Sequence, residues 1–351
     1  MGNGIPGPLS TAAILFWVKN LHSRKIGPFE VSAIGLGCMN ISAGYGPADD
    51  RESERLLLGA LDAGYTFFDT AAMYGAGHNE ELIGRTLSHR REEFTLASKC
   101  GIFKGANGRT QTDSRPEVLR KTCEDSLRRL QTDVIDLYYL HRIDPGVPVE
   151  ESVGTLSELV LEGKIKTIGL SEVSTASLRR AHAVYPITAL QSEYSLWART
   201  PERQILDACK ELGVTFVPFS PLARSFLTGE TQDVTNLPDD DIRATIARPR
   251  FEPENFARNV KLLVPFRDIA QEQNCSMAQL ALAWILARAG GTMIPIPGTR
   301  SMGHMQDNAG AGDIRLDAAT VSTLDDLINE STVAGNRYSE RIMTSIDSEK
   351  D

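Results

Sequence analysis

Residues 134–170 read VIDLYYLHRIDPGVPVEESVGTLSELVLEGKIKTIGL and contain one complete β–α–β unit. The run 134–140 is largely apolar and lacks the alternation of a half-exposed strand, which is typical of a parallel strand buried on both faces. A helical segment at 155–161 follows and stops at Gly163, because glycine is the residue that most often ends a helix. A second apolar run, 166–170, comes next. These residues therefore predict two parallel strands joined by a helix.

The same alternation extends in both directions from this unit. Strand-like apolar runs also occur at 32–37, 65–69, 94–98, 188–191, 214–219 and 293–296. Helical segments separate them, and two have the spacing of a capping box, at 114–117 and 276–279. Eight strands alternating with helices predict an α/β chain that folds as a single-domain (β/α)8 TIM barrel. The alternative is a doubly wound open sheet, but the sequence has no GxGxxG fingerprint.

Three segments lie outside this alternation. Residues 1–22 are expected to be a poorly ordered N-terminal extension, because the apolar run 12–18 is too short for a membrane span and no Lys or Arg precedes it. The barrel is assigned to 23–338 and a C-terminal tail to 339–351. A long polar loop, 228–253, is the third segment, and loops of this length are usually functional lids or disordered.

Net charge and the spacing of cysteines and histidines argue against several classes of function. The net charge of -9 disfavours binding to nucleic acid or to a membrane surface. The five cysteines are far apart and form no CxxC, which fits reduced thiols in a cytoplasmic protein. The six histidines form neither HxH nor HExxH, so no metal site is predicted.

Three predicted strands that follow one another in the chain end in ionisable residues. Asp69 closes the run 65–69, Lys99 follows the run 94–98, and His141 follows the run 134–140. Tyr74 lies five residues beyond Asp69, whereas Asp136 lies inside its strand and is interpreted as structural. Taken singly, each of these residues has an ordinary explanation. Asp69 would be a turn residue and Lys99 a solvated lysine, and His141 and Tyr74 would be structural or packing residues. Because barrels place their chemistry at the C-terminal ends of strands, together they predict an active site.

Motifs spread over 32–338 resemble those of the aldo-keto reductase family. They are Gly35-Leu-Gly-Cys-Met39, Gly64-Tyr-Thr-Phe-Phe-Asp-Thr-Ala-Ala-Met-Tyr-Gly75, Ser98-Lys99, Leu140-His141, Gly169-Leu-Ser171, Ser220-Pro-Leu222 and Ile294-Pro-Ile-Pro-Gly-Thr-Arg300. The late Gly335-Asn-Arg-Tyr338 is similar to the bacterial, plant and fungal branch that includes perakine reductase-like enzymes. The resemblance implies an NADPH-dependent (β/α)8 reductase whose catalytic tetrad is Asp69, Tyr74, Lys99 and His141.

The chemistry of these four side chains agrees with that assignment. A hydride that reaches a carbonyl carbon leaves negative charge on the oxygen, and a proton donor must meet it. Tyr74 is the expected donor. Lys99 is expected to lower the pKa of this phenol by up to roughly three units, since two charges about 4 Å apart attract by roughly 4 kcal/mol. Asp69 would keep Lys99 charged, and His141 would donate a hydrogen bond to the substrate oxygen.

The resemblance also implies the residues that bind NADPH or NADP+. Ser171 and Gln191 would bond the nicotinamide carboxamide, and Phe219 would stack on its ring. The pyrophosphate would be approached by Ser220, Leu222 and Arg224. The adenosine end would be held by Gly298, Thr299 and Arg300 at the 2′-phosphate, and by Gln306, Asp307 and Asn308 near the ribose and adenine. A short helix is predicted directly after Arg300, where free amides attract anions.

Three positions depart from the common pattern of the family. Glu172 stands where many members have asparagine. Ala223 and Ser225 occupy places often held by glycine in the loop that covers the phosphates, where a Cβ is expected to shift the loop. The tetrad itself is intact.

The sequence therefore predicts reduction of an aldehyde or ketone to an alcohol, with a small-molecule carbonyl or alcohol as substrate and an oligomer as an open possibility. Candidates for the pocket walls are Trp197, Phe103, Met73 and Tyr338. One alternative is a non-catalytic NADP(H)-binding regulatory barrel that resembles the potassium-channel β subunits, and the complete tetrad argues against it. The other is a metal-dependent barrel hydrolase, which would need clustered ligands.

Overall fold

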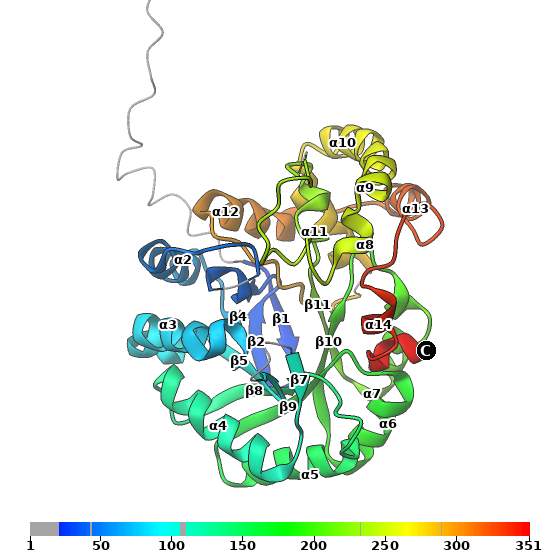
Figure 1. Cartoon of the computed structure of the whole chain (residues 1–351). Coiled ribbons are helices and arrows are strands. Elements are labelled where there is room, and N and C mark those ends of the chain that lie inside the picture. Colours follow the sequence, from blue (N-terminus) through cyan, green and yellow to red (C-terminus); the bar gives the residue numbers. More distant parts are fainter. Residues whose placement is uncertain (1–20, 43, 106–109, 232, 289) are drawn as a thin grey trace, which may run out of the picture.

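Seven parallel strands form the centre of the structure, a computed structural model that describes residues 21–351 except 43, 106–109, 232 and 289 (Figure 1). In chain order they are β3 Leu36–Gly37, β4 Phe67–Asp69, β5 Thr95–Cys100, β8 Ile135–Leu140, β9 Ile165–Ser171, β10 Ile187–Glu193 and β11 Thr215–Phe219. Each pairs in parallel with the next one in this order. Residues 1–20 of the expected N-terminal extension lie outside the described residues.

Residues 293–297 fill the remaining place between β11 and β3. The amides of Ile294 and Ile296 donate to carbonyls of β11 at 3.1 Å. On the other side, the carbonyls of Pro295 and Pro297 accept at 3.0 and 3.2 Å from amides in and just before β3. Proline has no N–H, so this segment donates on one side only and forms an irregular eighth strand. The closed ring confirms the predicted (β/α)8 barrel.

A short hairpin covers the N-terminal end of the barrel. Its strands, β1 Ser23–Ile26 and β2 Phe29–Ser32, pair in antiparallel, and Ile26 and Val31 join the hydrophobic cluster inside the barrel. The expected strand over 32–37 is therefore wrong in its first part, since Ser32 ends β2 and the barrel strand begins only at Leu36. The turn dipeptide at 27–28, Gly-Pro, is the sequence signal for this hairpin.

Alternate side chains of the strands fill the barrel interior. This inner cluster comprises Ile26, Val31, Phe67, Ala97, Leu137, Tyr139, Ala189, Val217, Ile294 and Ile296. Successive side chains of a strand point to opposite faces, so on β4, β5, β8, β10 and β11 the odd-numbered residues face inward. Gly169 on β9 leaves room for Tyr139, because a Cβ at that glycine would lie 2.3 Å from the ring.

A ring of helices covers the outer faces of the strands (Figure 1). Those between the strands are α2 Asp50–Asp62, α3 His78–Leu87, α4 Pro116–Leu130, α5 Val149–Leu161, α6 Thr175–Val184 and α7 Ile205–Leu212, and α10 Leu263–Glu272, α11 Met277–Arg288, α12 Met302–Gly310 and α13 Ala318–Leu327 complete the ring. Among the described residues, no helix is both long enough and apolar enough to cross a membrane.

Of the two predicted capping boxes, one forms. Before α11, the Gln279 amide donates to the Ser276 hydroxyl at 3.0 Å, and the Ser276 amide donates to the Gln279 side chain at 3.1 Å. The box at 114–117 is wrong, because Arg115 is the residue that precedes α4 and no side chain caps it. The Ser114 amide instead donates to Asp144 at 3.0 Å, which orients this serine towards the neighbouring loop.

Asp136 holds the outer face of the sheet together. Its carboxylate accepts from Arg91 at 2.6 Å, from the Leu96 amide at 2.8 Å and from Lys166 at 2.7 Å. These partners come from three different segments of the chain. The structural interpretation of this residue is therefore confirmed.

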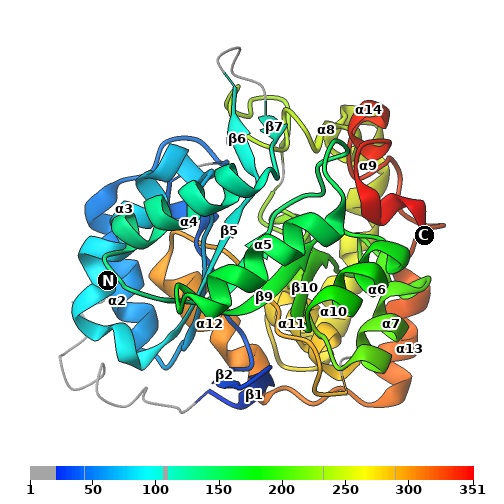
Figure 2. The ribbon, with the colours of Figure 1, turned by 90° about the horizontal axis from the view of Figure 1, so that it is seen from below.

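The C-terminal end of the barrel carries the longer loops. They contain the hairpin of β6 Ile102–Lys104 and β7 Thr110–Thr112 and the short helices α8 Arg248–Phe251, α9 Pro253–Asn259 and α14 Glu340–Met343. Figure 2 shows β6, β7, α8 and α14 at the end opposite the β1–β2 hairpin. The last residues of the chain pack here too, since the Asp347 carboxylate accepts from the amide and the hydroxyl of Ser174, both at 2.8 Å.

The polar loop 228–253 crosses this end of the molecule. Its acidic run is divided: Asp241 is buried and accepts from Arg243 at 2.7 Å, whereas Asp239 and Asp240 are exposed. The Ile242 amide donates to the carbonyl of residue 44 at 2.9 Å, which ties this loop to the one that follows β3.

Candidate active site

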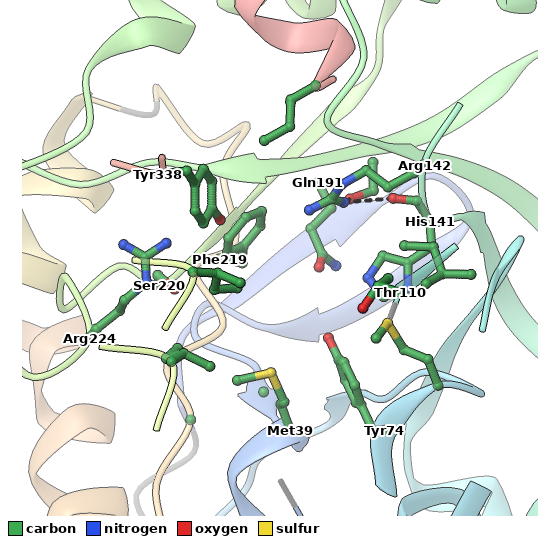
Figure 3. A pocket seen from close by; sticks show the side chains of 18 of the residues that line it. Met39, Tyr74, Thr110, His141, Arg142, Gln191, Phe219, Ser220, Arg224 and Tyr338 are labelled. Carbon is green, nitrogen blue, oxygen red and sulfur yellow. Dashed lines mark hydrogen bonds between the residues drawn. The ribbon is translucent and has the colours of Figure 1, made fainter. Parts of the chain in front are cut away.

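A cavity of about 970 Å³ opens at the C-terminal end of the barrel (Figure 3). Its volume is at the upper end of the range for small-molecule sites, and its position is the one where barrel enzymes bind their substrates. Most of the predicted site residues line it, namely Asp69, Tyr74, His141, Ser171, Gln191, Phe219, Ser220, Leu222, Arg224 and Gly298. In the described part of the chain, no group of three or more side chains is arranged to hold a metal ion.

Strand geometry explains why three of the catalytic candidates point inward. Asp69, Lys99 and His141 each follow by two residues a side chain of the inner cluster, on β4, β5 and β8 respectively. They therefore continue the same inward face of their strands. Because β4, β5 and β8 are neighbours in the sheet, the three side chains meet at one place.

Lys99 and Asp69 form a buried ion pair at the base of the cavity. The Lys99 amine donates to one carboxylate oxygen of Asp69 and, at 2.7 Å, to the carbonyl of Thr70. The other Asp69 oxygen accepts from the Gln191 amide at 2.8 Å. Burial alone would lower the pKa of Lys99, but the charge of Asp69 and the Tyr74 hydroxyl outweigh it and the pKa is raised. Lys99 is therefore a fixed positive charge beside the cavity.

Tyr74 lies on the cavity wall near His141 (Figure 3). It begins a 3-10 turn, Tyr74–Gly77, in which the next two residues have φ of 57° and 56°. The Lys99 amine lies 5.1 Å from the centre of the Tyr74 ring. The Tyr74 and His141 rings meet edge to face with their centres 6.0 Å apart. The phenol thus has both a charged amine and an imidazole as neighbours.

Burial decides the protonation state of both rings. Removal from water raises the pKa of Tyr74 although Lys99 opposes the shift, so the phenol is protonated at neutral pH. The expected net lowering of this pKa is therefore wrong, because desolvation is the larger effect. Burial, and then the charges of Lys99 and Arg142, lower the pKa of His141 well below its usual value. His141 is a neutral imidazole.

Ser171, Gln191 and Phe219 lie side by side at the ends of three neighbouring strands, β9, β10 and β11. The Ser171 hydroxyl accepts from Arg142 at 3.0 Å and can donate in turn to a group in the cavity. Gln191 is fixed by its bond to Asp69. Figure 3 shows Gln191 and Phe219 facing the same space as Tyr74. This side of the cavity offers polar side chains next to an aromatic face.

The loop that follows β11 has a left-handed backbone at four positions. Ser220, Ala223, Arg224 and Ser225 have φ of 48°, 51°, 56° and 70°. Glycine adopts such φ values without strain, which is the physical reason for the expectation of glycine at positions 223 and 225. Backbone turns of this kind direct N–H groups to one side and form concavities that bind anions. The loop is thus suited to a phosphate in spite of its two departures from glycine.

Arg224 is almost completely buried in the wall beside this loop. One terminal nitrogen donates to Glu193 at 2.8 Å, and the guanidinium lies 5.1 Å from the centre of the Tyr338 ring. Its Nε and Nη1 atoms are buried and have no hydrogen-bond partner among the described residues. A buried donor without an acceptor costs about 1–3 kcal/mol. These atoms indicate an acceptor that the chain itself does not supply.

Arg300 is bonded to the loop that follows β3. Its three guanidinium nitrogens donate to the carbonyl oxygens of Asn40, Gly46 and Pro47 at 2.7 to 2.8 Å. The side chain is therefore engaged within the protein. An anion that binds Arg300 would have to replace some of these carbonyls.

The other residues predicted for the adenosine end lie around the start of α12, the predicted short helix. Gly298 lines the cavity, and Thr299 is buried next to it. On α12, Gln306 is exposed, Asp307 is half-buried and Asn308 is buried. The structure thus brings Gly298 together with the catalytic candidates and places the others farther along the same side.

A buried ion-pair network behind the cavity wall has no counterpart among the predicted site residues. Arg337 donates to Glu172 at 3.1 Å and to Glu193 at 3.3 Å, and the Ser348 hydroxyl donates to Glu172 at 2.8 Å. Burial would raise the pKa of Glu172, but the charge of Arg337 lowers it to about 2. The network ties the end of the chain to β9 and β10. Its one signal in the sequence is the unusual glutamate at 172, which has a φ of 54°, a conformation that asparagine tolerates better.

The candidate wall residues divide into two groups. Met73 and Tyr338 line the cavity. Trp197 instead packs in the hydrophobic core, and Phe103 is 40% exposed on β6, so both are wrong as walls. Arg142, at the end of β8, is a wall residue without a prediction.

The chain is similar to several known proteins. The model of the aldo/keto reductase family matches residues 33–329. A probable aldo-keto reductase of Glycine max is 42% identical over 312 residues, which cover 88% of this chain and 89% of the relative. An NADP(+) aldo-keto reductase of Schizosaccharomyces pombe is 41% identical over 325 residues, which cover 91% and 95%.

Two solved structures extend the likeness to the fold. A glycerol dehydrogenase of Gluconobacter oxydans has a TM-score of 0.79 at 31% identity and covers 87% of this chain and 94% of its own. An aldo/keto reductase of Klebsiella pneumoniae in complex with NADP and acetate has a TM-score of 0.70 at 27% identity and covers 91% and 99%. Since the family model and both relatives match nearly the whole barrel, the chain belongs to the aldo/keto reductase family.

Proposed function

We propose that this protein reduces an aldehyde or ketone to an alcohol with NADPH, with Tyr74 as general acid assisted by Lys99, Asp69 and His141. The observation that carries the proposal is the meeting of a protonated phenol, a charged amine and a neutral imidazole at one corner of a large cavity. The NADP(+) dependence of the relative from Schizosaccharomyces pombe and the NADP in the structure from Klebsiella pneumoniae support the choice of cofactor.

The residues present fit NADP(H) at three places. Phe219 offers an aromatic face and Ser171 a hydroxyl to the nicotinamide. The left-handed loop 220–225 and the unpaired nitrogens of Arg224 offer donors to the pyrophosphate. Gly298 has no space for a side chain, since a Cβ would come within 2.5 Å of Asn40, and its backbone can approach a ligand closely.

The side chains of the site divide the remaining work. Bound NADPH supplies the hydride that reaches the carbonyl carbon. Tyr74 and His141 donate hydrogen bonds to the carbonyl oxygen, and the proton then moves from the Tyr74 oxygen to the developing alkoxide. Lys99, held by Asp69, stabilises the phenolate that remains. Because His141 is neutral, Tyr74 is the stronger acid of the two.

Turnover of simple carbonyl compounds tests this proposal. The purified protein is incubated with NADPH and a panel of aldehydes and ketones, and the loss of NADPH absorbance is followed. We expect reduction of several aldehydes. Tight binding of NADPH without reduction of any compound in the panel would instead support the non-catalytic regulatory barrel.

NADPH is expected to bind more tightly than NADH, by roughly ten- to hundred-fold. The reason is a charge-assisted contact of Arg300 with the 2′-phosphate, worth about 1.5–3 kcal/mol. The bonds from Arg300 to the loop after β3 would be exchanged for this contact. Fluorescence titration with both cofactors measures the ratio, and Arg300→Ala should remove most of it. Arg55→Ala, an exposed arginine on α2, is the control. Equal dissociation constants, unchanged in Arg300→Ala, would contradict the assignment.

Cleavage in the loop 228–253 is expected to be rapid without cofactor and suppressed by NADPH. Asp239 and Asp240 are exposed outside helices and strands, and the loop begins three residues after the anion-binding segment 220–225. Exposed loops are the usual sites of proteolytic cleavage, and ligands that order a loop protect it. A protease that cleaves before aspartate, with the cut sites identified by mass spectrometry, provides the measurement. A cleavage rate at 239–240 that is indifferent to saturating NADPH would exclude a role as a lid.

A further inference from the structure

The positive and negative charges of the side chains that line the cavity do not balance. Among the described residues that line it, the one carboxylate is Asp69, which is paired with Lys99. Three arginines line the same wall: Arg142, Arg224 and Arg341. Arg224 is bonded to Glu193. Arg142 and Arg341 have no ion-pair partner among the described residues, so the wall carries an excess of positive charge.

Arg142 lies where a substrate would be next to the catalytic groups. It directly follows His141, and Figure 3 shows it near His141 and Gln191. One terminal nitrogen, Nη1, donates to the His141 carbonyl at 2.6 Å and to the Ser171 hydroxyl at 3.0 Å. Its Nε and Nη2 atoms have no hydrogen-bond partner in the described part of the chain. The bonded nitrogen fixes the guanidinium, and the remaining donors are available to a ligand.

Arg341 reaches the cavity from the last segment of the chain. It lies on α14 and is exposed, and its side chain has no hydrogen-bond partner among the residues that the structure describes. The segment is anchored on both sides of this helix. Arg337 is bonded to Glu172 and Glu193 before it, and Asp347 is bonded to Ser174 after it. Arg341 is therefore brought to the wall by a well-fixed part of the protein.

The phosphate sites proposed for NADPH use neither of these two cations. In the proposed function, the phosphates of NADPH are bound by the loop 220–225 and by Gly298, Thr299 and Arg300, on the side of α12. Arg142 instead lies at the end of β8, beside the residues assigned to the nicotinamide and to the carbonyl. An anion at this end has to come from the other reactant.

From this arrangement we infer that the preferred substrates are aldehydes or ketones that carry a carboxylate or another anionic group, recognised by Arg142 and Arg341. The inference rests on the proposed function. Arginine matches a carboxylate with two parallel donors, which gives orientation as well as attraction. The anionic group would be bound by Arg142 and Arg341 while the carbonyl oxygen lies between Tyr74 and His141.

Matched pairs of aldehydes test this inference. The pairs are 4-oxobutanoate with its methyl ester, and 4-carboxybenzaldehyde with its methyl ester, so that two spacings between carbonyl and anion are sampled. We expect kcat/KM to be roughly ten- to hundred-fold higher for the carboxylate of at least one pair, mainly through KM. Added salt should reduce this ratio, because it screens the attraction. A ratio of one or less in both pairs would overturn the inference.

Variants of the two arginines locate the effect. Arg142→Met and Arg341→Met should each lower the ratio of carboxylate to ester, and Arg142→Lys should keep part of it because the charge remains. Among the described residues, the Arg341 side chain makes no hydrogen bond or ion pair with a proposed cofactor residue, so its variant stays informative if Arg142→Met also disturbs Ser171. Arg55→Met makes the same change of net charge on an exposed part of α2 and should leave the ratio unaltered. A ratio that survives the double variant Arg142→Met/Arg341→Met would overturn the assignment.

A binding measurement separates this inference from the proposed function. Calorimetric titration of the NADP+-loaded protein compares 4-(hydroxymethyl)benzoate with its methyl ester. Tighter binding of the carboxylate, lost in Arg341→Met, would support anion recognition even if no aldehyde were reduced, and only the proposed reaction would then fail. Reduction of both esters and carboxylates without any difference in affinity would overturn the inference and leave the reaction standing.

Discussion

Replacing Tyr74 with phenylalanine is expected to lower kcat for carbonyl reduction by about 10²–10⁴-fold, the usual contribution of a general acid. The ring and its edge-to-face contact with His141 remain, and only the hydroxyl beside Lys99 is lost. Burial keeps this hydroxyl protonated at neutral pH, so it is ready to donate in the reduction direction. The fold and the affinity for NADPH should change little, because the assigned cofactor contacts lie elsewhere in the cavity.

Steady-state kinetics on a responsive aldehyde, with NADPH binding measured separately, provide the result. Tyr185→Phe, which removes a hydroxyl at the end of α6, is the matched control and should turn over normally. Activity of Tyr74→Phe within a few-fold of the unmodified protein would show that Tyr74 is not the acid. His141 would then be the first group to examine.

Replacing Lys99 with methionine is expected to lower kcat by about 10²–10³-fold or more, the cost of removing one preorganised electrostatic contact. The phenolate of Tyr74 would lose the positive charge that stabilises it. The same change leaves Asp69 buried without its cation, which should reduce the free energy of unfolding by about 3–5 kcal/mol. Activity and stability would therefore fall together.

A second variant separates these two effects. Asp69→Asn combined with Lys99→Met removes the unpaired carboxylate as well, and we expect most of the lost stability to return while the activity does not. Asp69→Asn alone should be milder, because Lys99 keeps its bond to the Thr70 carbonyl and its place beside Tyr74. Denaturant titration gives the stabilities and single-turnover reduction gives the rates. Recovery of activity in the double variant would show that Lys99 acts through stability alone.

The sequence by itself determined the barrel. Strands buried on both faces are apolar throughout and helices have a different period, so the eight units could be counted without coordinates. The predicted strands also singled out Asp69, Lys99 and His141 as candidates, because barrels place their chemistry at the C-terminal ends of strands. The predicted bounds of the strands were wrong where the local sequence signals were short. The β1–β2 hairpin depends on one turn dipeptide, and the eighth strand is irregular because Pro295 and Pro297 lack an N–H.

The tertiary structure alone decided what surrounds those side chains. The attraction between opposite charges predicted that Lys99 would lower the pKa of Tyr74, but burial reverses the sign of the shift, and burial depends on every segment that covers the site. The partners of Arg300 and of Arg337 come from parts of the chain far away in sequence. The excess positive charge of Arg142 and Arg341 is likewise visible only in the folded chain, where the end of β8 and helix α14 line the same cavity. The local sequence pattern determines the direction in which a side chain points. Its pKa and its interaction energies depend on neighbours that folding brings together.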